Sequence, residues 1–279
     1  MSYMGKVRPT VALTSSDITD GAVIEAKIGG DAVTSAKIND GAIATAELSA
    51  DAVTPAKMAD SAFLANRNMI INGAMQIAQR STSTAAIGAG ANTVDRWVTT
   101  KTNAGTWTQT QDAATVSTAG FGYSLKNDCT TALVSLAAGD RLMMSYRFEG
   151  FNCQNLKKGT ASAESVTISF WVNATKTGTY VLEIYDHDNS RHICSPYTVS
   201  VTNTWEYKTI TFAGDTTGAL GNDNAKSLEL QWYMAAGTNY TSGTLATSWA
   251  ASTNANRAVG QVNAADSTSN NFHLAGVQM

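Results

Sequence analysis

The sequence predicts a mainly β protein in which an antiparallel β-sandwich follows an oligomeric stalk of short repeats. Three observations lead to this fold class. Residues 18–63 repeat with a period of ten. The composition changes near Ala65, and short segments of alternating apolar and polar residues follow. Turn residues rather than long helical patterns separate these segments, which is typical of an antiparallel sandwich.

Two apolar rows run through the repeat. The first is Ile18, Ile28, Ile38, Leu48 and Met58, and the second is Val23, Val33, Ile43, Val53 and Phe63. Burying two such side chains stabilises a unit by about 1.5–3 kcal/mol each, whereas ordering ten residues costs roughly 1–2 kcal/mol each in backbone entropy. A unit therefore cannot fold alone. It must pack on its neighbours and on copies of itself in a parallel, symmetric bundle.

The conformation of each unit stays open between two alternatives. Large apolar residues recur every five positions, which turns a helix face by roughly 140° and excludes a continuous helix or a heptad coiled coil. An extended spiral would keep the alanines and isoleucines on one face. We favour short helix–turn units, because Thr34 and Thr54 suit N-caps and Pro55 suits a first helical position. A disordered linker would not keep its rows in phase.

Beyond the repeat, six segments show strand-like alternation. They are residues 141–148, 165–174, 179–185, 206–212, 228–234 and 272–278. A single helical turn is expected at 155–158, and Trp97 and Trp205 are expected to be core residues at strand starts. Residues 237–269 form a long polar stretch, and a loop of that length is usually functional or packed by its own side chains. Trp249 and 259–262 would hold it in place.

Composition excludes several classes of function. The chain has 279 residues and a net charge of −3, which gives no footprint for nucleic acid. It contains no stretch of eighteen apolar residues for membrane insertion, and residues 1–10 do not form a secretory signal. Cys129, Cys153 and Cys194 are widely spaced without a CxxC pair, so we expect free, buried thiols made in a reducing cytosol.

Several segments together carry a resemblance to a known family. They are 66–80 (NRNMIINGAMQIAQR), 95–97 (DRW), 122–125 (GYSL), 147–150 (RFEG), 168–171 (ISFW), 258–263 (AVGQVN), 266–270 (DSTSN) and 272–278 (FHLAGVQ). This set is similar to the distal jelly-roll domain of bacteriophage tail fibres, and the ten-residue repeats resemble those of phage fibres. The opening MSYMGKVRP resembles the fibre proteins of short-tailed, cyanophage-like viruses. The family usually continues past Gly-Val-Gln, whereas this sequence stops at Met279.

The resemblance implies a homotrimeric virion protein that is assembled in the host cytoplasm. Residues 1–16 would attach it to the phage tail or another virion protein, 17–64 would form the trimeric stalk, and 65–279 would form a jelly-roll head that recognises a host surface glycan or other receptor. No enzyme activity and no cofactor are expected. Alternatives are a head fibre or capsid decoration protein of the same architecture and, further away, a polysaccharide depolymerase. A bacterial adhesin lacks its expected signal peptide.

Glycan binding would use aromatic platforms, because sugar faces are apolar and their rims carry hydroxyls. The candidates are Trp171, Trp232, Tyr233, Tyr240 and Trp249. Trp171 is out of phase with the apolar face of its strand. Trp232 and Tyr233 are adjacent on a strand and point to opposite faces, so one of them should face solvent or a neighbouring subunit. For each candidate the alternative is a core or intersubunit aromatic.

Acidic side chains suggest weaker alternatives. Asp186 and Asp188 lie in a dense polar turn (DHDN), but calcium needs six to eight oxygens and an ordinary turn is favoured, so no metal is expected. Candidate acids for a depolymerase are Asp140, Glu149, Glu183 and Asp186, whose pairing the sequence does not show. The three histidines, His187, His192 and His273, are too scattered for a triad.

Overall fold

The computed structural model describes residues 68–90, 93–113 and 120–279, together with isolated positions between 24 and 48. The chain divides into two units, Met1–Leu64 and Ala65–Met279. The predicted virion-attachment segment, and Ile18, Val23, Val33, Val53, Met58 and Phe63 of the predicted stalk rows, lie outside the described residues. Each unit is considered by itself.

Four residues of the predicted stalk rows are described. These are Ile28, Ile38, Ile43 and Leu48, and all four are exposed in the single chain. The amide of Lys37 donates a hydrogen bond to the carbonyl of Thr34, which closes one turn within that repeat. The oligomeric stalk and the conformation of its units stay predictions.

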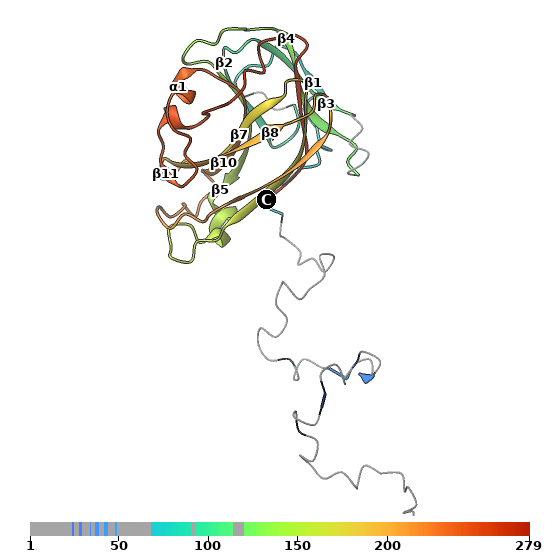
Figure 1. Ribbon diagram of the computed structural model, residues 1–279, viewed down its shortest axis with the longest axis vertical. Coiled ribbons are helices and arrows are strands. Elements are labelled where there is room, and N and C mark those ends of the chain that lie inside the picture. The colour runs from blue at the N-terminus through green and yellow to red at the C-terminus, as the bar shows by residue number, and fades with distance from the viewer. Residues whose placement is uncertain are drawn as a thin grey trace, which may run out of the picture. The chain divides into compact units, whose positions relative to one another are not determined.

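The second unit consists of two antiparallel sheets (Figure 1). Sheet A contains, in spatial order, β1 (Ser83–Thr84), β3 (Thr106–Asp112), β4 (Ser124–Thr131), β12 (Asn271–Gln278), β6 (Val166–Ala174) and β9 (Glu206–Phe212). Sheet B contains β11 (Ala250–Ala251), β8 (Arg191–Val199), β7 (Gly178–Asp186), β10 (Lys226–Ala236), β5 (Arg141–Glu149) and β2 (Trp97–Thr102).

The order of the strands makes this sandwich a jelly roll. The chain crosses between the sheets on passing from β4 to β5, from β5 to β6 and from β6 to β7, and then forms the β7–β8 hairpin within sheet B. It crosses again from β8 to β9, from β9 to β10 and from β10 to β12. The sheets β4-β12-β6-β9 and β5-β10-β7-β8 therefore face each other as in two linked Greek keys. The predicted sandwich and its jelly-roll topology are confirmed.

All six predicted strands are present, with ends that differ by at most two residues from the expected ones. The sequence pattern missed β2, β3, β4 and β8, which are rich in threonine and other polar residues or contain proline. The expected turn at 155–158 is a 3-10 helix, η7 (Gly150–Leu156), which ends at Lys157 in the left-handed conformation, with φ of 49°.

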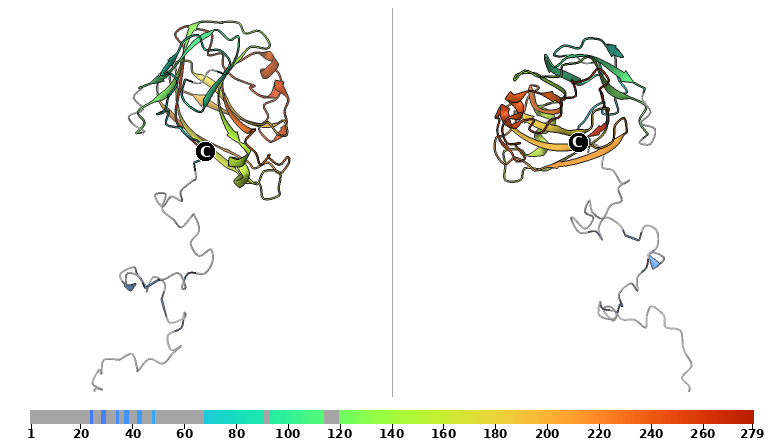
Figure 2. Two further views of the ribbon diagram at one scale, coloured as in Figure 1. Left: turned by 180° about the vertical axis from the view of Figure 1, so that it is seen from behind. Right: turned by 45° about the horizontal axis from the view of Figure 1, so that its top comes forward.

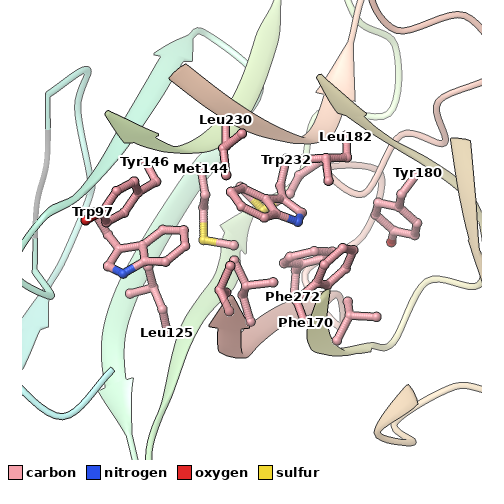
Figure 3. Packing of buried hydrophobic residues seen from close by; sticks show 14 of the residues in the cluster. Trp97, Leu125, Met144, Tyr146, Phe170, Tyr180, Leu182, Leu230, Trp232 and Phe272 are labelled. Carbon is pink, nitrogen blue, oxygen red and sulfur yellow. The ribbon is translucent and has the colours of Figure 1, made fainter. Parts of the chain in front are cut away.

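Large aromatic side chains fill the space between the sheets. Trp97, Trp232 and Phe170 are fully buried, and the Trp232 ring lies 5.5 Å from Trp97 and 5.7 Å from Phe170. Figure 3 shows Met144 beside both indoles and Phe272 below Trp232. Trp97 is therefore a core residue, as expected. The expectation for Trp205 is wrong, because it is only half-buried and lies on the outer side of sheet A.

The chain between β10 and β12 covers the outer face of sheet B. It contains α1 (Thr238–Thr241), β11 and η8 (Asn254–Asn256), which Figures 1 and 2 show on the side of the sandwich away from β1 and β3. A second apolar cluster forms beneath it, from Met143, Val181, Cys194, Tyr233, Ala236 and Ala258, with Tyr240, Leu245 and Ala246 packed against it. This loop is packed by its own side chains, one of the two outcomes its length predicts.

A buried ion pair fixes the loop to the sheet. Arg257 of the loop donates from Nε and Nη2 to the carboxylate of Glu183 on β7, at 2.9 to 3.1 Å. His192 and Tyr233 also contact that carboxylate, at 2.8 and 3.0 Å. Glu183 is completely buried. A buried charge of this kind persists only when it is paired and hydrogen-bonded.

Two simpler expectations can be compared directly with the structure. Cys129, Cys153 and Cys194 are free and buried. Within the described part of the chain, no helix has the length and apolar character needed to cross a membrane.

Replacing Arg257 by methionine should destabilise the head strongly. The change leaves the Glu183 carboxylate buried without its cation, which typically costs about 3–5 kcal/mol. Unfolding in urea, followed by tryptophan fluorescence, measures the loss. The matched control is the double variant Glu183→Gln/Arg257→Met, which removes both charges and should recover part of the stability. A single-variant loss below about 1 kcal/mol would contradict the role given to the pair.

The same pair should make stability depend on pH. Burial raises the pKa of Glu183, but the hydrogen bond from His192 and the charge of Arg257 outweigh it, so the pKa lies below its ordinary value. The stabilisation is therefore complete above the unfolded pKa of about 4.3 and is lost as the pH falls below it. Urea midpoints of the wild type should fall in acid more steeply than those of the double variant.

Candidate functional site

The outer face of sheet A carries aromatic side chains that the core does not use. Along β6, Ile168, Phe170 and Val172 point inward and are fully buried. Trp171 and Asn173 alternate with them and are half-buried on the outer side. The alternation of the sequence predicts this placement of Trp171, and the structure confirms it.

Trp171 forms a platform with a neighbouring tyrosine. The strand register places Tyr207 of β9 directly opposite Trp171, and the two rings lie 5.3 Å apart. Tyr207 is 54% exposed. On the other side the register pairs Trp171 with Ala275 of β12, whose side chain is small. The two rings therefore form an apolar surface at the edge of the sheet, with no bulky neighbour on β12.

A row of polar and aromatic groups lies next to this platform. His273 of β12 is paired with Asn173 of β6 and with Lys126 of β4. The ring of Trp205 meets the imidazole edge to face, 5.8 Å away. Beyond His273, Lys126 forms an ion pair with Asp128 at 3.1 Å. Hydrogen-bonding side chains on two further strands, β12 and β4, thus flank the platform.

His273 is held in its neutral form. Its Nδ1 lies 3.1 Å from the hydroxyl of Ser124, which is fully buried. Burial lowers the pKa of His273 to about 4, although the nearby Asp112 carboxylate opposes the shift. A neutral imidazole has one donor and one acceptor nitrogen, so it can bond a hydroxyl group in either direction.

The expectation that Trp232 or Tyr233 faces solvent is wrong. Trp232 points into the core between the sheets. Tyr233 points to the outer face of sheet B, where the loop between β10 and β12 covers it completely. Its hydroxyl donates to Glu183 at 3.0 Å. The sequence pattern gave the two orientations correctly but could not show that the long loop closes over this face.

The two loop candidates have separate positions. Tyr240 is half-buried over sheet B, where the guanidinium of Arg141 lies 5.0 Å from the centre of its ring. Trp249 is half-buried between the edges of the two sheets and packs against the core. Neither residue belongs to the platform on sheet A.

The acidic turn at 186–189 does not offer a metal site. Asp186 is fully buried, and its Oδ2 accepts a hydrogen bond of 2.5 Å from the Lys158 ammonium. Lys158 also contacts Asp215 at 3.0 Å and the carbonyls of Thr217 and Gly218. The Lys158 ammonium thus occupies the position among these oxygens that a metal ion would need.

Further acidic candidates also have structural partners. Asp188 accepts a hydrogen bond from the Gly221 amide at 2.8 Å. The carboxylate of Asp140 accepts bonds from the Ala137 amide and the Asn103 side chain. The Glu183, His192 and Cys194 ligand atoms lie close together, but Arg257 already supplies the positive charge there. These contacts hold loops in place.

Residue-level reasoning missed three members of the outer face, namely Trp205, Tyr207 and His273. The sequence did contain a signal for Tyr207. Phe212 points inward from β9, and alternation along the strand places Tyr207 on the opposite, outer face, as it does for Trp171 relative to Phe170. The position of His273 depends on β12 lying between β4 and β6, which no local pattern reveals.

Comparisons with known proteins give only weak similarity. No family model matches the chain, and no curated protein matches it. Among solved structures, the enzymatically active domain of tailspike protein 4 of bacteriophage CBA120 aligns over 76% of this chain with 14% identity and a TM-score of 0.36. This chain spans 21% of that one.

Two carbohydrate-binding modules also align. A CBM4 structure matches 75% of this chain and 98% of its own, with 12% identity and a TM-score of 0.36. The structure of TmCBM61 in complex with β-1,4-galactotriose matches 76% of this chain and 97% of its own, with 8% identity and a TM-score of 0.32. Similarity at this level carries no argument about what this chain binds.

The outer-face aromatics should matter little for folding. We expect Tyr207→Ala to change the free energy of unfolding by less than about 1 kcal/mol, because the ring is mostly exposed. Trp232→Ala removes a fully buried indole and should cost about 3–5 kcal/mol. Denaturant unfolding of the two variants side by side tests the contrast. Equal losses would show that the platform is a structural part of the head.

Proposed function

We propose that the chain is a homotrimeric phage tail fibre that recognises a host surface glycan with the outer face of sheet A. The observation that carries this proposal is the Trp171–Tyr207 platform. Large aromatic side chains on a sheet face that is not needed for the core indicate a binding surface. On sheet B the loop covers Tyr233, while the half-buried Tyr185 packs against His187 and lies under the guanidinium of Arg257, 4.7 Å from the centre of its ring.

The chemistry of this face suits a sugar. The apolar face of a pyranose ring can stack on Trp171 and Tyr207, while its hydroxyls need neighbouring donors and acceptors. Asn173 and His273 lie in the next row and supply both kinds of group. The charges of Lys126 and Asp128 offset each other, and the Asp112 carboxylate beside His273 adds one negative charge, which disfavours an acidic sugar. The face is therefore suited to an uncharged stretch of polysaccharide.

The assembly follows from the repeat. In this proposal residues 17–64 join three chains, residues 1–16 attach them to the tail of the virion, and the three heads bind together. Linking several weak sites can raise overall avidity by about 10²–10⁴ without any new contact. The fibre binds and does not cleave. In support, Asp140, Glu183 and Asp186 are bound to structural partners.

Removing either ring of the platform should weaken recognition without unfolding the β-sandwich. We expect Tyr207→Ala and Trp171→Ala each to weaken binding to a bacterial surface polysaccharide by about tenfold or more, because the loss of one aromatic ring that stacks on a ligand typically costs about 1–3 kcal/mol. A microarray of bacterial polysaccharides identifies the ligand, and titration calorimetry measures its affinity.

The matched control is Thr167→Ala. Thr167 lies on the same face of β6 as Trp171, on the same strand but away from the two rings. This variant should bind as the wild type does. Wild-type affinity in both platform variants would refute the assignment of this face, and shortened polysaccharide after incubation would refute the proposal that the chain is not an enzyme.

Binding should be independent of pH across the neutral range. Because burial holds the pKa of His273 at about 4, its imidazole is neutral above pH 5 and gains a proton only as the pH approaches 4. We expect a constant affinity from about pH 8 to 5 and a decrease below. A transition near the ordinary histidine pKa of about 6.5 would contradict the buried, neutral state.

The trimer has its own test. Sedimentation or native mass measurement of the full chain should give three times 29.3 kDa, about 88 kDa. Ile38→Asp places a charge in an apolar row and should shift the population toward monomer. Lys27→Asp, on the polar side of the repeat, should leave it unchanged. A monomeric wild type would rule out the stalk, while leaving the sugar site of the head to be judged separately.

A further inference from the structure

A cleft of about 550 Å³ lies between β8 of sheet B and the edge strand β9 of sheet A. Ile193 and Phe212 form its apolar floor, and both are buried. The loops 213–217 and 247–249 close it on two sides. Its volume lies within the range of about 300–1,000 Å³ that is typical of small-molecule sites. Trp249 is the aromatic residue in its wall.

The indole of Trp249 is held rigidly. Its Nε1 donates to the carbonyl of Ala213 at 2.7 Å. The Lys158 ammonium lies 5.0 Å from the ring centre, and Lys158 is itself buried and does not line the cleft. The next residue, Ala250, pairs with His192 in the short strand β11. A ring fixed in this way loses little conformational freedom when a ligand stacks on it.

The charges around the cleft cancel. Arg191 donates from Nε and Nη2 to the two oxygens of Asp215, at 2.7 and 3.0 Å. Lys158 is paired with Asp186 and Asp215 behind the indole. Burial raises the pKa of Asp215, but hydrogen bonds from Arg191 and Lys158 outweigh it and keep the carboxyl ionised. Two cations thus face two anions, so the cleft does not attract a charged ligand.

The rim of the cleft carries hydroxyl groups. Thr216, Thr247 and Ser248 line it and are exposed. Within the described part of the chain, the hydroxyls of these three residues have no hydrogen-bond partner. A fixed aromatic ring, an electrically neutral lining and hydroxyls free to bond are together the chemistry that recognises an uncharged sugar.

We propose that this cleft is a second carbohydrate site, which takes a neutral sugar at the end of a glycan chain. The inference deepens the proposed function and rests on it for the choice of glycan over other ligands. The sheet face crosses several strands and suits a continuous run of sugars. The cleft is walled by two loops and suits a terminal residue. Each head would then hold a chain at two points.

The test uses the full chain and four neutral probes: glucose, galactose, mannose and N-acetylglucosamine at millimolar concentration. Saturation-transfer NMR detects binding, and quenching of tryptophan fluorescence gives the affinity. We expect at least one probe to bind and Trp249→Ala to weaken that binding by about tenfold or more, equivalent to the loss of one stacking contact. Added salt should leave the affinity unchanged, because the lining is neutral.

Two variants guard against a folding defect. Thr247→Ala/Ser248→Ala removes two exposed hydroxyls without touching the core, and it should weaken the same probe with an unchanged unfolding midpoint. Phe151→Ala removes an exposed aromatic ring that belongs neither to the cleft nor to the sheet face, and it should leave monosaccharide binding intact. Binding of none of the four sugars, or equal affinity in the wild type and both cleft variants, would overturn the proposal. So would binding confined to an anionic sugar or to an extended peptide.

The outcomes separate this inference from the proposed function. In one outcome, the cleft variants bind polysaccharide and monosaccharide as the wild type does, and Tyr207→Ala binds polysaccharide more weakly. Only the second site is then refuted. If Tyr207→Ala binds normally and the cleft variants do not, the cleft stands and the assignment of the sheet face falls.

Discussion

The buried pair of Arg257 and Glu183 decides which face of the sandwich is closed. It fastens the long loop between β10 and β12 over sheet B, where the loop covers a second apolar cluster. Sheet A has no such cover from this loop, so the side chains that alternate outward along β6 and β9 reach the surface. The distinction between the covered face of sheet B and the open face of sheet A therefore begins with one guanidinium and one carboxylate.

Aromatic residues have three different roles in this architecture, and strand parity separates them. Trp97 and Trp232 fill the space between the sheets, Tyr233 joins the polar network under the loop, and Trp171 with Tyr207 lies outside. One step along a strand thus decides whether the same type of residue lies in the core or at the surface. Two large rings side by side on the sheet surface form an apolar patch that the core does not require, which is the physical basis of the proposal for sheet A.

Local pattern predicted the fold class, the six most regular strands and the outward direction of Trp171, because these depend on alternation within one segment. It could not predict β3 or β8, whose polar sequences become strands through pairing with their neighbours. It also placed Trp232 and Tyr233 on opposite faces but could not foresee that both would be buried, since the cover over Tyr233 comes from a loop that contacts it through Arg257 and Ala258. The row containing His273 required the strand order, which is a property of the whole chain.

Lys158 has a consequence that reaches beyond the stability of one turn. Its ammonium lies among two carboxylates and two carbonyl oxygens, a cluster that would otherwise call for a bound divalent ion. Because Lys158 supplies the positive charge, these oxygens need no bound metal ion to offset their charge. This corner of the β-sandwich should therefore stay intact in ion-poor water, or in surroundings where calcium is sequestered.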